Sequence, residues 1–312
     1  PCTNYSNVYS YLPPPFVSWG ARIGGTGIDS VFSGIAVDSS GNVYVTGYYS
    51  STTLTLYDKN GSPFGTTLSN QGSYDAFIAK YDTNGNVLWG AHIGGAGDDG
   101  GYGIAVDSSG SVYVTGYYNS STLTLYDKNG SPFGTTLSNQ GSYDAFIAKY
   151  DTNGNVLWGA HIGGAGDESG RGIAVDSSGN VYVTGYYNST TLTLYDKNNN
   201  PFGTTLSNQG LIDAFIAKYD TNGNVLWGAH IGGVGNDQGR GLTVDSSGSV
   251  YVTGSYSSIT LTLYNKDGTA FGTTLPRQSI SIDVFIAKYD TNGNVLWGAH
   301  IGGVGDDQGY GI

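Results

Sequence analysis

The chain has 312 residues, including 52 Gly and 26 Tyr, with a formal net charge of -12 and a pI of about 4.4. This acidity argues against nucleic acid as a partner, because nucleic-acid binding needs a basic face. No apolar run approaches the roughly 20 residues of a membrane helix, which argues against membrane insertion. Cys2 is the single cysteine, so an internal disulfide is excluded and the role of its thiol is open.

A repeat of about 70 residues organises the chain. Trp19, Trp89, Trp158, Trp227 and Trp297 lie 70, 69, 69 and 70 residues apart, and each opens the phrase W-G-A-x-I-G-G. A fixed period of this kind indicates a repeat architecture in which each unit packs on its neighbours. It also argues against an enzyme, because catalysis needs unlike groups around one reacting atom, whereas near-identical repeats supply the same groups several times.

The first full copy of the repeat shows the predicted elements in chain order. Alternating apolar residues predict four main strands, which we name A (34–38), B (43–49), C (76–81) and D (87–93). Two further strands, within 54–68, form a hairpin inserted between B and C. The unit is therefore expected to be a four-stranded antiparallel blade that carries one inserted B–C hairpin.

Three turns of the form Asp-x-x-Gly-x join these strands, at 38–42, 58–62 and 82–86. The form is typical of short hairpin turns in which Gly takes the left-handed conformation and Asp accepts backbone N–H groups. Most of the negative charge is therefore expected to come from turn aspartates.

A lone blade would expose both of its faces, so the blades must stack. Radial stacking buries both faces and leaves only short edges, which predicts an all-β fold of the β-propeller type. Strand A is small and apolar, as expected near a crowded axis. Strand D carries the large Trp and is expected to lie outermost.

Two phrases of the repeat resemble a known family. G-I-A-V-D-S-S-G-N-V-Y-V-T-G, which starts at Gly34, and D-A-F-I-A-K-Y-D-T-N-G-N-V-L-W, which starts at Asp75, resemble the SBBP-type β-propeller repeat. The resemblance implies a propeller from a bacterial surface protein or a large DNA virus, and it brings no shared catalytic residues. The departures from the family pattern are the long segments 50–73, 119–142, 188–210 and 257–281.

The repeat also divides the chain. Residues 1–18 are an N-terminal segment expected to add partial blade strands, because 8–12 and 16–23 match strands C and D. Repeats then fill 19–312, which predicts four complete blades and a partial one. Their approximate bounds are 19–88, 89–157, 158–226, 227–296 and 297–312.

The number of blades in a closed ring is left open by the sequence. Strands A and B supplied from beyond residue 312 would give at least five blades, whereas the family resemblance implies seven. The chain starts with neither Met nor a signal-peptide pattern. We therefore expect a chain that begins after processing or a segment of a longer protein.

The B–C hairpins and the D–A loops are expected at the same end of every blade, because alternate strands run in opposite directions. The D–A loops are acidic, and around an axis their oxygen atoms could hold Ca²⁺. The alternative is that each acid accepts N–H groups of its own loop. The candidate metal ligands are Asp98, Asp99, Asp167, Glu168, Asp237, Asp306 and Asp307.

Four histidines repeat with the blades and are not expected to share a metal. Each lies on strand D of a different blade, so the rings should be far too separated to meet at one ion. They are expected to be strand-face residues. They are His92, His161, His230 and His300.

Tyrosines lead into the inserted hairpins and lie within them. An exposed Tyr ring covers the C–H face of a sugar well, and neighbouring Asn and Asp pair with its hydroxyls. The alternative is ordinary cross-strand packing. The candidate ligand-binding residues are Tyr49, Tyr57, Tyr118, Tyr126, Tyr187, Tyr195 and Tyr264.

Two functions fit these patterns. The first is a non-enzymatic structural or assembly protein of a cell or virion surface, extracellular or surface-exposed. In this role the four hairpin segments or the incomplete ends of the array contact other copies of the protein or other surface proteins. The second is a multivalent, lectin-like binding module that uses one face of the propeller for glycan or protein ligands, with repetition strengthening each weak contact. Ca²⁺ is the one cofactor that the sequence suggests.

Overall fold

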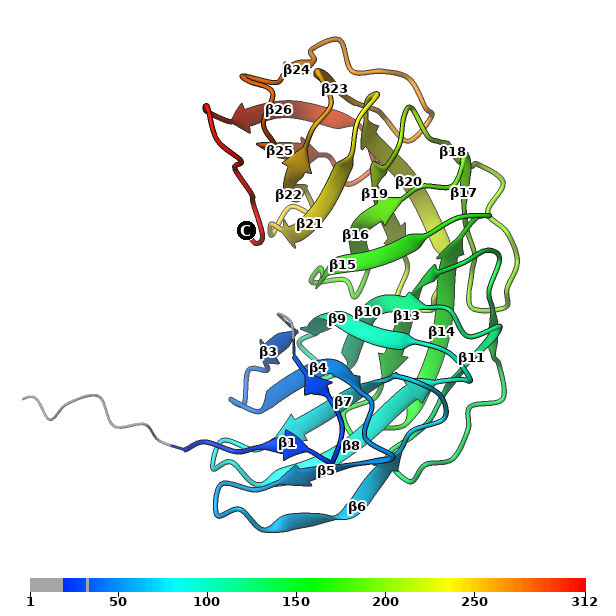
Figure 1. Cartoon of the computed structure of the whole chain (residues 1–312), viewed down its shortest axis with the longest axis vertical. Helices are drawn as coiled ribbons and strands as arrows, with labels where there is room; N and C mark the ends of the chain where they lie inside the picture. Colours follow the sequence, from blue (N-terminus) through cyan, green and yellow to red (C-terminus); the bar gives the residue numbers. More distant parts are fainter. Residues whose placement is uncertain (1–18, 32–33) are drawn as a thin grey trace, which may run out of the picture.

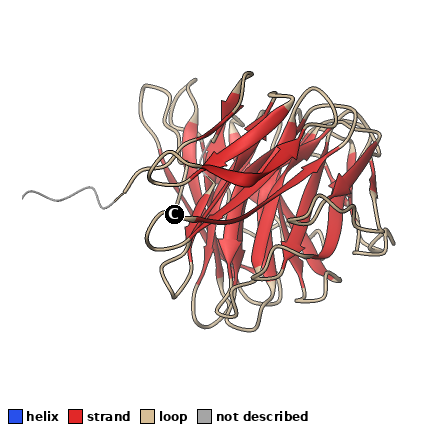
Figure 2. Cartoon of the chain, turned by 90° about the horizontal axis from the view of Figure 1, so that it is seen from below, coloured by secondary structure: helices blue, strands red, loops and turns tan. Residues whose placement is uncertain are grey.

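The computed structural model describes residues 19–31 and 34–312, which form strands joined by turns (Figures 1 and 2). The strands build one small three-stranded sheet and four larger sheets, and the larger sheets follow one another along an open arc (Figure 1), with loops at both rims (Figure 2). The described part contains no helix with the length and apolar character that crossing a membrane requires. The predicted all-β, propeller-type fold is confirmed.

Each of the four blades has its antiparallel strands in the order A-B-C-D. In the first blade, strand A is split into β2 (Asp29–Ser30) and β3 (Ile35–Val37), followed by β4 (Val43–Tyr49), β7 (Asp75–Tyr81) and β8 (Val87–Gly94). The second blade contains β9 (Asp99–Val106), β10 (Val112–Tyr118), β13 (Asp144–Tyr150) and β14 (Val156–Gly163). The third contains β15 (Glu168–Val175), β16 (Val181–Tyr187), β19 (Asp213–Tyr219) and β20 (Val225–Gly232). The fourth contains β21 (Asp237–Val244), β22 (Val250–Tyr256), β25 (Asp283–Tyr289) and β26 (Val295–Ile301).

The remaining strands are β1 (Ile23–Gly24) and the inserted hairpins. These hairpins are β5 (Thr53–Tyr57) with β6 (Pro63–Ser69), β11 (Thr122–Leu125) with β12 (Leu137–Ser138), β17 (Thr191–Leu194) with β18 (Leu206–Ser207), and β23 (Thr260–Leu263) with β24 (Leu275–Pro276). The predicted strands at 8–12 and 16–18 lie outside the described residues.

Each inserted hairpin pairs with strand D of the preceding blade rather than with its own blade. Strand β17 pairs with β14, placing Leu194 opposite Ile162 and Thr193 opposite Gly163. The same register joins β11 to β8 and β23 to β20. The predicted insertion of a hairpin between strands B and C is confirmed, but strand D is not outermost at the inner junctions, because the next blade's hairpin pairs with its outer edge.

The outer edge of strand D explains this crossing. An edge strand offers unpaired N–H and C=O groups, which a second strand can satisfy. The hairpin also packs on its own blade, because the Leu194 Cδ1 atom would lie 2.5 Å from a Cβ atom placed on Gly228 of β20. Gly in the W-G-A phrase thus makes room for a hairpin leucine. Each hairpin bridges two neighbouring blades.

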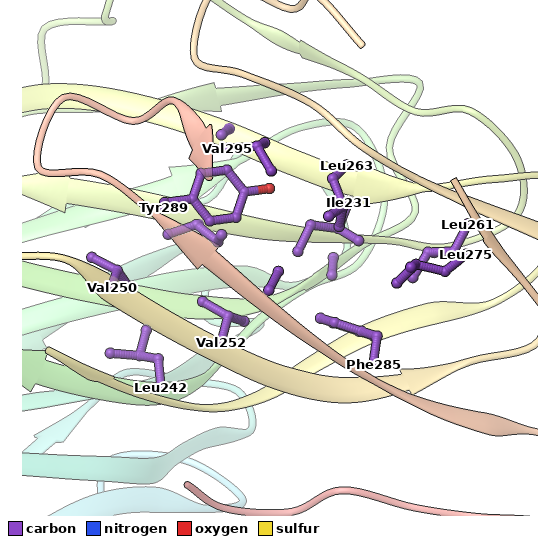
Figure 3. Packing of buried hydrophobic residues seen from close by; sticks show 14 of the residues in the cluster. Ile231, Leu242, Val250, Val252, Leu261, Leu263, Leu275, Phe285, Tyr289 and Val295 are labelled. Carbon is purple, nitrogen blue, oxygen red and sulfur yellow. The ribbon is translucent and has the colours of Figure 1, made fainter. Parts of the chain in front are cut away.

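The hydrophobic core is divided among the junctions between blades. Figure 3 shows the last junction, where Ile231 of β20, Leu261 and Leu263 of β23, and Phe285 of β25 pack together. All four side chains are buried. Apolar burial of this kind is the main stabilising term for stacked repeats.

Polar contacts repeat at the same junctions. The Trp158 Nε1 atom of the second blade donates to the Thr221 carbonyl oxygen of the third at 3.1 Å, and the Lys149 Nζ atom donates to the same oxygen at 3.1 Å. Trp89 and Trp227 make the equivalent bond to the next blade. Each turn that accepts these bonds is a C–D turn, so the Trp fixes the position of the neighbouring blade.

The turns confirm the predicted chemistry. At the first turn, Gly41 has a φ of 80°, and the Asp38 Oδ1 atom accepts the Ser40 and Asn42 backbone N–H groups at 2.9 Å each. In the third hairpin Asn199 takes the Gly position with a φ of 61°, which Asn tolerates better than most residues. Many of the acids therefore hold turns.

Candidate functional site

A cavity lies between the second and third blades, at the end that carries the B–C and D–A connections. It has a volume of about 280 Å³. We call it the tyrosine groove, and it is lined by Tyr102, Tyr117, Tyr143, Asp167, Glu168, Ser169, Arg171 and Tyr186.

Two aromatic rings of the tyrosine groove lie against one cation, and two more rings continue the row. The Arg171 guanidinium carbon lies 3.9 Å from the centre of the Tyr102 ring and 5.2 Å from that of Tyr186. The centre of the Tyr117 ring lies 5.3 Å from that of Tyr102 and 5.7 Å from that of Tyr143. These distances suit cation–π attraction and edge contacts between rings.

A smaller hollow of about 210 Å³ extends the groove toward the first blade. It shares Tyr117 and Tyr143 with the tyrosine groove and adds Tyr48, Tyr74 and Asp98. The chain therefore presents a row of tyrosines across three blades on one end of the molecule.

A β-bulge in each inner strand positions the central residue of this row. Opposite β16, the pairing of β15 skips Arg171, because Gly170 faces Gly185 and Gly172 faces Thr184. Tyr102 and Arg240 are skipped in the same way in β9 and β21. A bulge changes the direction of a side chain, so the variable residue of the G-x-G phrase lines the groove.

Sequence reasoning missed these residues, although a signal for them exists. Repeats 89–157 and 158–226 differ at nine positions. Four of these differences fall on residues that line the groove: Asp99 against Glu168, Gly100 against Ser169, Tyr102 against Arg171, and Tyr143 against Ile212. The few positions at which two near-identical repeats differ are therefore the sequence signal that points to the groove.

The structure corrects the prediction for three of the candidate tyrosines. Tyr49, Tyr118 and Tyr187 are fully buried at the ends of their B strands, so their rings cannot stack on a ligand. Tyr49 instead meets Phe77 edge to face, with 6.4 Å between ring centres. These three tyrosines therefore pack between strands, which was the alternative to ligand binding.

The other four candidate tyrosines lie at the blade junctions, away from the groove lining. Tyr195 stacks on His161 of the preceding blade with 4.1 Å between ring centres, and Tyr126 and Tyr264 stack in the same way on His92 and His230. Tyr57 instead lies under the guanidinium of Arg22, 3.9 Å from its ring centre.

The histidines lie on separate blades, as predicted, and the inner three are buried. Neither ring nitrogen of His161 has a hydrogen-bond partner. Burial lowers the pKa of His161 to about 4, since an apolar site disfavours the charged ring. His161 is therefore a neutral packing residue under Tyr195.

The predicted metal ligands do not form a shared site. The Asp99 carboxylate accepts the Gly95 N–H at 2.8 Å and the Ser120 hydroxyl at 2.6 Å, and Glu168 makes the equivalent bonds one blade later. Burial raises the pKa of Asp99 to about 6 and that of Glu168 to about 7. Asp237 is buried in the same way, whereas Asp98, Asp167, Asp306 and Asp307 are more exposed.

Among residues 19–31 and 34–312, no three His, Cys, Asp or Glu side chains lie close enough together to hold a metal. The hydrogen bonds of Asp99 and Glu168 instead match the alternative, in which each acid holds its own loop.

A second set of acids, one per blade, was not singled out from the sequence. Asp144 opens strand β13 and is fully buried. Its Oδ2 atom accepts the Gln140 N–H at 3.0 Å and the Tyr118 hydroxyl at 3.4 Å, whereas its Oδ1 atom has no partner. Burial raises the pKa of Asp144 to about 8. The carboxyl group therefore keeps its proton at neutral pH.

Replacing Asp144 with Asn is expected to stabilise the protein at alkaline pH. The pKa of Asp144 in the folded protein, about 8, lies above the ordinary Asp pKa of 3.8. The stability that this carboxyl contributes is therefore complete below about pH 3.8 and is lost as the pH rises through about 8. Asn cannot ionise, so the stability of the variant relative to the natural chain should rise between about pH 5 and about pH 8. Urea unfolding at both pH values measures it. An equal effect of the substitution at both would contradict the buried, protonated carboxyl.

Comparison with known proteins agrees with the fold. The model of the SBBP β-propeller repeat matches residues 18–48, 157–190 and 226–255. An uncharacterized WD repeat-containing protein of Acanthamoeba polyphaga mimivirus is 31% identical over 339 residues, covering 94% of this chain and 24% of the relative. Regulatory protein FlaEY of Caulobacter vibrioides is 27% identical over 213 residues, covering 67% of this chain and 20% of the relative.

The chain thus spans a quarter or less of the length of these relatives. Among solved structures, a protein of unknown function from Bacteroides caccae aligns with 72% of this chain and 90% of its own, at 10% identity and a TM-score of 0.26.

Proposed function

Since this chain belongs to the SBBP-type β-propeller repeat proteins, we propose that it is a non-enzymatic structural protein that assembles on the surface of a cell or virion. Its partners in this role are copies of itself or other surface proteins. The observation that carries the proposal is the way in which each blade is tied to the next.

Three kinds of contact meet at each inner junction. At the junction of the second and third blades, a hairpin strand pairs with β14, Tyr195 stacks on His161, and Trp158 donates to the Thr221 carbonyl. Strand pairing, ring stacking and a partly buried hydrogen bond together resist sliding and twisting of one blade on the next. Repeated along the arc, they make a stiff body suited to a structural role.

The repetition of chemistry supports a role without catalysis. The buried acids that open strand C and the histidines of strand D recur from blade to blade, whereas an active site needs unlike groups that converge. The relatives are named as repeat and regulatory proteins. The viral source of one relative favours the virion as the surface, and the net charge of -12 disfavours nucleic acid as a partner.

Negative-stain electron microscopy of the purified protein tests this proposal. Comparing samples with and without a calcium chelator shows whether assembly requires a bound metal ion. Ordered rows, rings or a lattice in both samples are expected. Separate arcs at every protein concentration would overturn the structural role.

A second function, a multivalent binding module, is favoured by the tyrosine groove. Tyr117 and Tyr143 present rings beside the Arg171 guanidinium and the Asp167 carboxylate. Flat rings next to polar groups match the C–H faces and hydroxyls of a sugar. A row of such hollows across several blades would bind a repetitive glycan by multivalency.

Substitutions taken from the repeat itself test the binding function. Ile occupies the position of Tyr143 in the next repeat, so Tyr143→Ile should keep the fold. Combined with Tyr117→Ala, it should reduce glycan binding, measured on a glycan array and by calorimetry, about tenfold or more, because each stacking ring contributes about 1 kcal/mol. Ser121→Thr, also natural in the next repeat, is the matched control outside the groove lining. Unchanged binding of an array-positive glycan by the double variant would exclude the tyrosine groove as its site.

A further inference from the structure

The smaller hollow, at the junction of the first and second blades, is lined by two pairs of steeply inclined aromatic rings. Tyr48 and Tyr74 belong to the first blade, and their ring centres lie 5.3 Å apart with the rings at 82° to each other. Tyr117 and Tyr143 belong to the second blade, with 5.7 Å between ring centres and an angle of 62°. Each pair therefore forms a corner. A corner suits a rounded group, whereas the flat face of a sugar stacks on a single ring.

Asp98 adds a negative charge to the lining of the smaller hollow. Its backbone is fixed on both sides, because the Asp99 N–H donates to the Tyr74 carbonyl at 2.8 Å and the Asn119 N–H donates to the Asp98 carbonyl at 3.0 Å. Among residues 19–31 and 34–312, no side chain or backbone N–H pairs with the Asp98 carboxylate. The charge of this carboxylate is therefore available to a ligand in the hollow.

The three junctions between complete blades differ at this place. At the second junction the Arg171 guanidinium carbon lies 3.9 Å from the Tyr102 ring centre, so the chain supplies its own cation there. At the third junction Ile212 and Asn236 take the places of a ring and a carboxylate. At the first junction Tyr102 holds the position of Arg171, and the smaller hollow is lined by four tyrosines and a carboxylate, with no Lys or Arg. The first junction therefore has the surroundings of a cation without the cation.

We propose that the smaller hollow binds a methylated ammonium group, the group that choline carries. Aromatic rings attract an organic cation that lies within about 6 Å of their centres, and the Asp98 carboxylate adds a Coulombic attraction. The net charge of -12 also draws cations toward the protein. This site goes beyond the structural role and beyond glycan binding, and it depends on neither.

The lining of the smaller hollow disfavours other cations. Ca²⁺ needs roughly six to eight oxygen ligands, whereas Asp98 is the one carboxylate in the lining. A primary ammonium group carries three N–H donors and is strongly hydrated, so it loses more water contacts than one carboxylate replaces. A quaternary ammonium has no N–H donor, and its methyl groups carry the charge into contact with the rings.

Equilibrium dialysis of the full chain against labelled choline tests the site. One choline per chain, with a dissociation constant in the millimolar range, is the expected result. The neutral isostere of choline, in which carbon replaces the nitrogen, should displace labelled choline about tenfold less well, because it keeps the shape and loses the charge. A primary amine should also compete about tenfold less well. Equal competition by either compound would overturn the proposal.

Two substitutions taken from the third repeat test the residues of the hollow. Asp98→Asn and Tyr74→Ile copy Asn236 and Ile212, so both variants should keep the fold. Each should weaken choline binding about threefold, and the double variant about tenfold. Asp167→Asn is the matched control, because it is the same change one blade later and outside the lining of the smaller hollow. Binding that is unchanged in the double variant would overturn the site.

The outcomes are separate from those of the proposed functions. Tyr74 and Asp98 do not line the tyrosine groove, so the double variant should bind an array-positive glycan as the natural chain does. Loss of glycan binding together with choline binding would overturn the independence of the site. A chain that binds no choline in the millimolar range would overturn the proposal, whether or not it forms ordered arrays in the microscope.

Discussion

Replacing residues 188–212 with an Asn-Gly turn is expected to destabilise the protein by more than about 5 kcal/mol, because three buried leucines leave and each large-to-small loss in a core costs roughly 2–5 kcal/mol. The turn can be built, since Tyr187 and Asp213 are directly paired across β16 and β19 and a two-residue turn joins such strands. Urea unfolding measures the loss of stability. Quenching of Trp fluorescence should increase as the cover of Trp158 is removed.

The first hairpin supplies the control for this replacement. The same turn in place of residues 50–74 also removes three buried leucines, Leu54, Leu56 and Leu68. Its hairpin pairs with the short β1 instead of the strand D of a complete blade, so the junction of the second and third blades keeps its contacts and Trp158 should stay shielded. If both replacements had equal small effects and Trp158 stayed shielded, the hairpins would be appendages rather than the links between blades.

Trp158→Ala is expected to lower the free energy of unfolding by about 3–5 kcal/mol, the usual cost of emptying a large buried aromatic site. Trp158 is buried against the third blade, and its indole N–H donates to the Thr221 carbonyl. Trp297→Ala changes the same residue of the same repeat where no blade covers it, and its cost should be near 1 kcal/mol or less. Urea unfolding of both variants measures the contrast.

The two tryptophans have the same local sequence. The difference between the losses of unfolding free energy in the two variants therefore measures the contribution of the contact with the next blade. Similar losses for both substitutions would show that Trp stabilises its own blade alone. Self-association that buries Trp297 would increase the loss of unfolding free energy that Trp297→Ala causes. Both variants should therefore be measured at low protein concentration, where the protein is monomeric.

Local features of the fold were predictable from the sequence. The alternation of apolar residues identified strands A to D, and the Asp-x-x-Gly-x turns behave as expected, with Asp38 accepting two N–H groups. Both features depend on neighbours in sequence. The pairing partner of the inserted hairpin depends on residues far away in the sequence. The alternation of apolar residues gives no information on which sheet edge a strand joins. The crossing of β17 to β14 therefore had to come from the structure.

The candidate site was predicted only in its general position. The groove lies at the end of the molecule that the sequence singled out, which carries the B–C and D–A connections. The individual residues were not predicted correctly, and Tyr48 and Tyr49 illustrate why. They are adjacent on β4, so their side chains point to opposite faces, and the sequence alone did not show that Tyr49 faces the core. The bulge that skips Arg171 shifts the alternation once more.

Hydrogen exchange at the hairpin amides tests the central claim, that each hairpin is a structural link to the preceding blade. The Tyr195 N–H donates to the His161 carbonyl at 3.0 Å, and the Tyr264 N–H donates to the His230 carbonyl at 3.1 Å. Both amides should therefore exchange as slowly as those within β13 and β19. Exchange of either amide as fast as the exposed loops would contradict the link, and with it the stiff array on which the structural role depends.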